Sequence, residues 1–134
     1  MQKPRVPYII VTALFCLAIL PGAVMDIVQP EMVVAIVEKL GLPLHLLTLI
    51  GVWKLLGVAA LATPKYRRLN EWAYAGFFFD LTGAAFLHAA AGDTAGIAPP
   101  LVIGVLLVAS YRLRDAMRAA TASTSEAMAS PAHA

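Results

Sequence analysis

The sequence is poor in cysteine and in charge. Cys16 is the single cysteine among 134 residues, and it lies inside an apolar run. One thiol cannot form a disulfide within the chain or a Cys-x-x-Cys pair, which excludes a disulfide scaffold and a dithiol redox centre. Charged residues make up 13% of the chain, about half the usual share in a soluble domain. The net charge is only +2 and no basic run alternates with aromatic residues, so no nucleic-acid partner is expected.

The common catalytic signatures are absent as well. The sequence contains no nucleophile elbow, no phosphate-binding loop, no paired acidic metal site and no His-Glu-x-x-His motif. The sequence therefore leaves open whether the protein is an enzyme.

Apolar residues are what the chain has in excess. Hydrophobic residues make up 60% of it, and the mean hydropathy is +0.79. The excess is spread along most of the chain, so a cleaved signal peptide does not explain it. A helix needs about 20 residues to cross a hydrocarbon core of about 30 Å, and four apolar stretches approach that length: Tyr8–Met25, Leu42–Ala62, Asn70–Ala91 and Ile97–Tyr111. The sequence predicts an all-α fold, a four-transmembrane-helix bundle in a lipid bilayer.

Two other segments complete the predicted organisation. In residues 31–39, valines and an isoleucine lie opposite Glu31, Glu38 and Lys39 on a helix, which predicts a short amphipathic interfacial helix after the first span. Asn70, directly before Glu71, is placed to cap the third span. After Arg118 the sequence "AATASTSEAMASPAHA" is small and polar. We therefore expect a membrane domain over residues 1–118 and a disordered tail over residues 119–134.

Basic residues gather on one side of this predicted bundle. They flank both termini and fill the central loop: Lys3, Arg5, Lys65, Arg67, Arg68, Arg112, Arg114 and Arg118. The opposite loops carry mainly acids, among them Asp26 and Asp93. By the positive-inside rule both termini are cytoplasmic, and Arg112 and Arg114 are expected to snorkel to the interface.

Two opposite charges fall inside predicted spans. Lys54 and Asp80 each lie about 13 Å from the cytoplasmic end of their helix, so they share one depth on neighbouring helices. A charge at the centre of a membrane helix costs about 2.5–3.5 kcal/mol on insertion scales. We therefore predict that Lys54 and Asp80 face each other or share a polar cavity. The alternative is that the pair only clamps two helices together, a contact worth about 0.6 kcal/mol.

Small residues accompany these charges at helical spacing. Gly76 and Gly83 flank Asp80 on one face, and Gly51 and Gly57 flank Lys54 in the same way. The two stripes predict one seam, which either leaves room for a small guest or serves ordinary close packing.

Two histidines form a second level near the opposite face. His45 and His88 each lie about 25 Å from the cytoplasmic boundary. Paired histidines across a bundle can hold haem. However, His45 is about 180° around the helix from Lys54, and a metal needs more ligands than two. We expect no metal site and regard haem as the weaker interpretation, with the histidines bonded to headgroups or loops instead.

The second and third spans resemble a known family. The segment Leu40–Asp93, above all "KLLG" and "EWAYAGFFFDLTGA", is similar to the DoxX-like family of small bacterial membrane proteins. The resemblance implies a four-helix bundle in the bacterial inner membrane. The family is named after the membrane subunit of a thiosulfate:quinone oxidoreductase, so the resemblance also implies a quinone and a partner oxidoreductase subunit. The positions that match the family pattern are Lys54, Glu71, Trp72, Tyr74, Gly76, Phe79 and Asp80.

Three functions are compatible with these features. In the first, a buried seam binds a quinone or another small apolar ligand, Lys54 donates a hydrogen bond and Asp80 carries a proton. Its candidate residues are Lys54, Asp80, Gly76, Gly83, Gly51, Tyr74 and Glu71. In the second, the chain is a structural or partner subunit without catalysis, alone as a homo-oligomer or beside an oxidoreductase. The third is a small proton-coupled transporter, which is disfavoured because the first span contains no acid.

Overall fold

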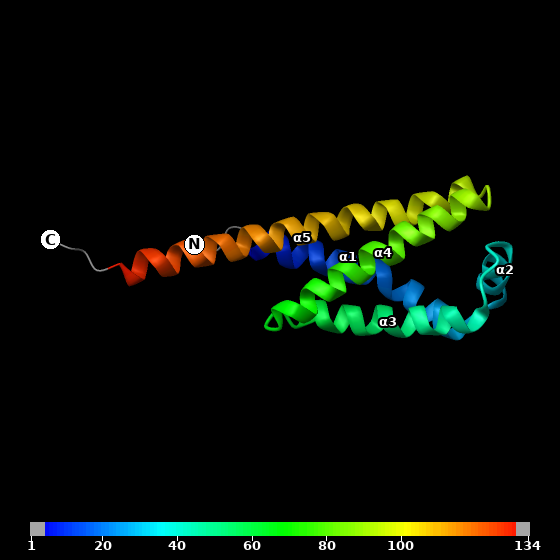
Figure 1. Ribbon diagram of the computed structural model, residues 1–134, viewed down its shortest axis with the longest axis horizontal. Helices are drawn as coiled ribbons and strands as arrows, with labels where there is room; N and C mark the ends of the chain where they lie inside the picture. Colours follow the sequence, from blue (N-terminus) through cyan, green and yellow to red (C-terminus); the bar gives the residue numbers. More distant parts are fainter. Residues whose placement is uncertain (1–4, 131–134) are drawn as a thin grey trace.

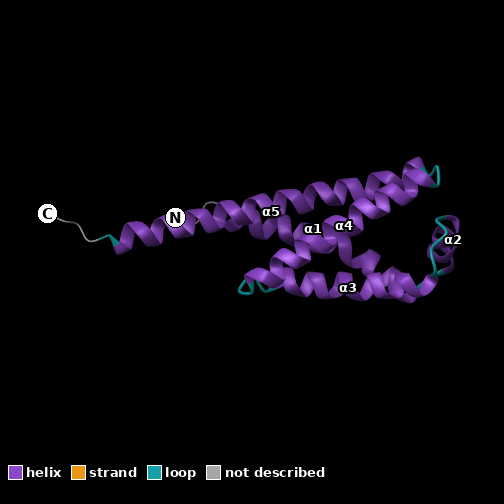
Figure 2. Ribbon diagram, in the orientation of Figure 1, coloured by secondary structure: helices purple, strands orange, loops and turns teal. Residues whose placement is uncertain are grey.

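The computed structural model describes residues 5–130 and is entirely helical in its regular structure over that range (Figure 2). Five helices follow one another: α1 (Arg5–Val28), α2 (Glu31–Lys39), α3 (Leu44–Ala62), α4 (Arg67–Ala90) and α5 (Thr94–Ala129). The prediction of an all-α fold is confirmed. Lys3 and residues 131–134 of the predicted tail lie outside the described residues.

The four long helices pack as a ring. α1 contacts α3 and α5, and α4 contacts α5 and α3. In Figure 1, α4 starts beside the end of α3 and diverges from it to reach the start of α5 at the other end of the molecule. α1 begins beside α5 and ends beside α3. Of the four neighbouring pairs, α3 and α4 pack least closely.

The core lies where α1 meets α4 and α5. Phe15 and Ile19 occupy one face of α1, four residues apart, as a helix requires of buried neighbours. Phe15 packs edge-to-face on Phe77 of α4, with ring centroids 4.9 Å apart. Tyr74, Leu81 and Leu107 are also buried in this cluster. Such aromatic contacts stabilise by about 0.5–1.5 kcal/mol beyond the area they bury.

Three of the helices described within residues 5–130, α1, α3 and α5, are long and apolar enough to cross a membrane. The remaining long helix, α4, has 24 residues but starts with Arg67 and Arg68 and carries Asp80 near its middle. Three of the four predicted spans are thus supported, and the crossing of α4 stays a prediction. The short helix after the first span is present as α2, with Val37 buried.

Two helix ends differ from expectation. α4 begins at Arg67, so Asn70 lies inside the helix and does not cap it. Its side-chain amide instead donates to the Ala60 carbonyl at 2.7 Å, which ties the start of α4 to the end of α3.

α5 continues as a helix to Ala129, although residues 119–130 are exposed throughout. The many alanines favour the helix there, and the hydroxyls of Thr121, Ser123 and Thr124 donate to carbonyls one turn earlier within it. The predicted tail is therefore helical in this part.

Candidate functional site

The charged centre of the bundle is Lys54 on α3. Its Nζ donates to Asp26 Oδ2 of α1 at 2.8 Å and lies 3.5 Å from Asp80 Oδ2 of α4. The side chains are 16%, 15% and 22% exposed, in the order Lys54, Asp26 and Asp80. The predicted proximity of Lys54 and Asp80 is present. We call Asp26, Lys54 and Asp80 the charged triad.

Asp26 is the member of the triad that sequence reasoning missed. The apolar run ends at Met25 and so places Asp26 in a loop, whereas α1 continues to Val28. A signal for it exists in the helical spacing, since Ile19, Ala23 and Asp26 follow one face at intervals of four and three. A proton-coupled transporter is disfavoured from the sequence because the first predicted span contains no acid. Since α1 contains Asp26, this argument against a transporter no longer holds.

Gly51 explains how α1 comes so close to Lys54. A Cβ built on Gly51 would lie 2.7 Å from Ile27 Cγ1 and 2.8 Å from the Ala23 carbonyl oxygen. Only glycine fits at such a distance. The predicted seam of small residues between α3 and α4 is therefore divided, because Gly51 serves the contact between α3 and α1.

A cavity of about 590 Å³ lies between α3 and α4. Of the charged triad, Lys54 and Asp80 line it. Its walls are largely apolar and aromatic, and Lys54 and Asp80 are its charged lining groups. The full lining is Leu49, Ile50, Trp53, Lys54, Leu56, Gly57, Ala60, Leu69, Trp72, Ala73, Gly76, Phe77, Phe79 and Asp80. An apolar cavity of this size with a few polar groups at one end is typical of a small-molecule site.

The glycines distinguish an open cavity from close packing. A Cβ on Gly57 would lie 2.6 Å from the Phe77 ring, so Gly57 lets that ring close one side of the cavity. A Cβ on Gly76 or Gly83 would meet nothing within 4 Å. Gly76 therefore contributes open space to the cavity wall. Gly83 shares that openness but does not line the cavity.

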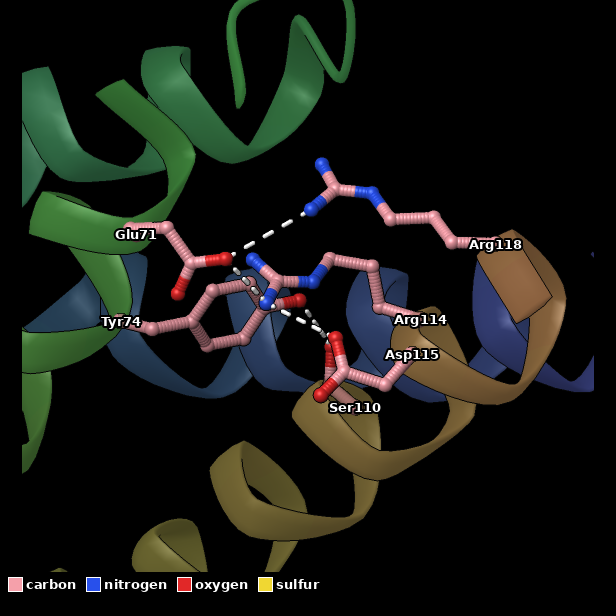
Figure 3. Close-up of polar contacts among 6 residues, drawn as sticks. All are labelled: Glu71, Tyr74, Ser110, Arg114, Asp115 and Arg118. Atoms are coloured by element: carbon pink, nitrogen blue, oxygen red, sulfur yellow. Dashed lines mark hydrogen bonds and ion pairs between the residues drawn. The ribbon is translucent and has the colours of Figure 1, made fainter. Parts of the chain in front are cut away.

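The predicted site residues Glu71 and Tyr74 belong to a second cluster, between α4 and α5 (Figure 3). At its centre is Arg114, whose side chain is 1% exposed. Its Nη2 donates to Glu71 Oε1 at 2.7 Å and to Asp115 Oδ1 at 3.0 Å. The guanidinium lies between the rings of Tyr74 and Tyr111, at 4.8 and 4.4 Å from their centroids. The expectation that Arg114 snorkels to the interface is wrong, because these rings and carboxylates bury its head group.

Hydroxyl groups extend this second cluster to α1. The Tyr74 hydroxyl lies 2.7 Å from Ser110 Oγ, and Ser110 Oγ lies 2.6 Å from Thr12 Oγ1. The chain of hydrogen bonds joins α4, α5 and α1 through buried groups. A smaller apolar cavity of about 300 Å³ borders Glu71 and Tyr74. Because the contacts Arg114–Glu71, Tyr74–Ser110 and Ser110–Thr12 each join two helices, we interpret this cluster as a clamp that holds α4, α5 and α1 together.

The two histidines do not meet. His45 is exposed at the start of α3. His88 Nδ1 lies 2.9 Å from Asp93 Oδ2, and Asp93 Oδ1 accepts from the Gly96 amide at the start of α5. These hydrogen bonds lower the pKa of the Asp93 carboxyl. Among residues 5–130, no three His, Cys, Asp or Glu side chains gather into a group that could hold a metal ion.

Comparison with known proteins gives one match. The family model of the DoxX-like family matches residues 10–110, which contain all of α2, α3 and α4 and every residue of the charged triad. No curated protein and no solved structure matches the chain.

Proposed function

Since the chain belongs to the DoxX-like family, we propose that it is a multi-pass protein of the bacterial inner membrane whose α3–α4 cavity binds a small apolar ligand with a hydrogen-bonding head group. A quinone is the ligand class that this chemistry fits best. In this proposal α4 is the fourth span and both termini are cytoplasmic.

The observation that carries the proposal is the contrast between the cavity walls and its charged end. Trp53, Trp72, Phe77 and Phe79 offer aromatic surface, and Lys54 and Asp80 are the charged groups that line the cavity. A quinone ring needs an apolar slot and a donor for its carbonyl oxygen. Lys54 supplies that donor, because an ammonium has three N–H groups and Asp26 engages one of them.

The position of the cavity agrees with a ligand that arrives through lipid. Trp53, Trp72 and Phe79 are 67%, 76% and 71% exposed on the outer surface of the helices. In a bilayer that surface faces lipid, so an apolar ligand dissolved in the membrane reaches the cavity from the side. No route through the bundle core is needed, and the core there is filled by Phe15 and Phe77.

A structural role is the second candidate, and one observation favours it. The hydrogen bond from Lys54 to Asp26 joins α3 to α1, so the triad also fixes helix packing. The two candidates differ in the cavity. If the triad is purely structural, a quinone should have the same affinity for the wild type and for a variant that lacks the Lys54 ammonium.

Tryptophan fluorescence tests the proposal, because both tryptophans of the chain line the cavity. The purified protein in lipid nanodiscs is titrated with a short-chain benzoquinone. We expect saturable quenching and at least about tenfold weaker binding in Lys54→Met, the effect of losing one charged hydrogen bond. Lys65→Met, which removes a loop lysine, is the matched control and should bind as the wild type.

The double variant Asp26→Asn/Lys54→Met guards against misfolding, because it removes the ammonium without leaving Asp26 unpaired. It should fold and still bind weakly. Quenching that rises linearly without saturation, equally in all the proteins, would show partition into lipid and overturn the proposal.

A further inference from the structure

We infer that the two aspartates of the charged triad have different tasks: Asp26 is the counter-ion of Lys54, and Asp80 is a neutral, protonated acid whose hydroxyl is the second donor to the ligand. The ligand part of this inference rests on the proposed function. The protonation part does not, and it is tested separately below.

The distances separate the two carboxyl groups. Lys54 Nζ is 2.8 Å from Asp26 Oδ2, a hydrogen bond of the short, charge-assisted kind. The same nitrogen is 3.5 Å from Asp80 Oδ2, outside hydrogen-bonding distance. Among the described residues, Asp26 therefore accepts the short hydrogen bond from the Lys54 ammonium, and the Asp80 carboxyl is left facing the cavity.

The charges of the triad do not balance if both acids are ionised. One ammonium faces two carboxylates, which leaves one negative charge where the side chains are only 15–22% exposed. The other groups that line the cavity are uncharged. On the far side of α4, the α5 residue Arg114 is engaged by Glu71 and Asp115. A proton on one acid is the simplest way to remove the unbalanced charge in an apolar medium.

Asp80 is the acid that takes the proton. Its ionised form would face the carboxylate of Asp26 across one shared ammonium, without a hydrogen bond of its own to that ammonium. Protonation of Asp26 would instead remove the short bond to Lys54. Two acids that share one site ionise separately, and the one with the better partner stays charged.

This division of tasks defines the ligand class more narrowly. The cavity then presents two donors at one end, an N–H of Lys54 and the O–H of Asp80, and no net charge. A neutral amphiphile with acceptor oxygens, such as a quinone carbonyl, satisfies both donors. A cationic amphiphile would need an ionised Asp80 and is the outcome that the inference excludes.

Infrared spectroscopy tests the protonation without a ligand. A protonated carboxylic acid has a carbonyl stretch that a carboxylate lacks. We expect that band in the wild type at neutral pH, and its loss in Asp80→Asn. In Asp80→Glu the band should move, because glutamic and aspartic acids absorb at different positions, whereas Asp26→Glu should leave it in place. Asp115→Asn, an exposed aspartate of α5, is the matched control and should keep the band. A wild type without the band, or a band that moves in Asp26→Glu, overturns the inference.

Quinone titration by tryptophan quenching tests the consequence for binding. Wild-type affinity should fall about tenfold from neutral to alkaline pH, where Asp80 ionises and loses its O–H. Asp80→Asn should remove this pH dependence, and Asp115→Asn should keep it. Asp26→Asn should bind about tenfold more weakly at neutral pH, since Asp80 then ionises to pair with Lys54.

The two proposals can fail separately. If the wild type binds no quinone but has the Asp80 band, the proposed function is wrong and the protonation stands. If the wild type binds quinone, and at neutral pH a benzoquinone with a quaternary ammonium tail binds more tightly than the neutral benzoquinone in a way that Asp80→Asn abolishes, Asp80 is ionised at neutral pH and the inference is wrong.

Discussion

Replacement of Gly51 by alanine is the sharpest test of how the charged triad is assembled. The new Cβ would lie 2.7 Å from Ile27 Cγ1 and 2.8 Å from the Ala23 carbonyl oxygen. Ordinary contacts between such atoms are about 3.5–4.0 Å, so α1 and α3 must separate by roughly 1 Å. The Lys54–Asp26 distance of 2.8 Å would then exceed the hydrogen-bond range of up to about 3.2 Å.

The size of the effect follows from two opposing contributions. Overpacking of this kind destabilises by about 1–3 kcal/mol. Alanine in place of glycine inside a helix stabilises by about 1 kcal/mol. The matched control is Gly22→Ala on α1, where a Cβ meets nothing within 4 Å. Gly22→Ala gains the helix propensity of alanine without overpacking, so Gly51→Ala should be less stable than Gly22→Ala by about 1–3 kcal/mol.

Thermal unfolding in one detergent, followed by tryptophan fluorescence, measures this difference. Gly51→Ala should also weaken quinone binding, because the counter-ion of Lys54 moves away. Equal melting temperatures for Gly51→Ala and Gly22→Ala would mean that α1 and α3 are not in close contact at Gly51. The position of Asp26 beside Lys54 would then be wrong as well.

Three further predictions concern groups outside the cavity. Asn70→Ala should destabilise the protein by about 1–3 kcal/mol, because the Ala60 carbonyl loses the hydrogen bond from the buried Asn70 amide that ties α4 to α3, and a chemical denaturation midpoint would show it. Arg114→Met should lower the melting temperature and Arg112→Met, an exposed neighbour, should not; equal effects would argue against a buried Arg114. The hydrogen bonds from His88 and Gly96 lower the pKa of Asp93 below its ordinary 3.8, so the stability they add is present above about pH 4 and is lost as acid protonates Asp93. Asp93→Asn should therefore lower the melting temperature at neutral pH and change it little in acid, and an equal loss at both pH values would contradict this role.

The proximity of Lys54 and Asp80 could be predicted from the sequence because it depends on few quantities. Helix rise fixes the depth of each residue, antiparallel neighbours share a level, and an unpaired charge in lipid is costly. None of these requires knowledge of side-chain packing. The structure has the two groups 3.5 Å apart.

The other members of the candidate site could not be predicted in the same way. Tyr74 and Asp80 are six residues apart, which turns their side chains about 120° away from each other on α4. Tyr74 therefore faces Ser110 of α5, and Asp80 faces Lys54 of α3. The depth of a residue along its helix does not predict the direction in which its side chain points around the helix axis. Asp26 was missed for a related reason, since hydropathy ended the first span at Met25 and gave no information on where the helix ends.

The helices are held together unevenly, and this unevenness creates the cavity. α4 is fixed to α5 and α1 by the Tyr74, Ser110 and Arg114 contacts, and α3 is fixed to α1 at Gly51. α3 and α4 themselves are joined near their connecting loop, where Asn70 bonds to Ala60. Farther from that loop the two helices diverge (Figure 1). Lys54 and Asp80 line the cavity there, with Nζ and Oδ2 3.5 Å apart. The Lys54–Asp80 contact thus lies between α3 and α4, which are each fixed to α1 by other contacts. A ligand seated between Lys54 and Asp80 would contact both α3 and α4, so its binding and the packing of α3 against α4 must depend on each other.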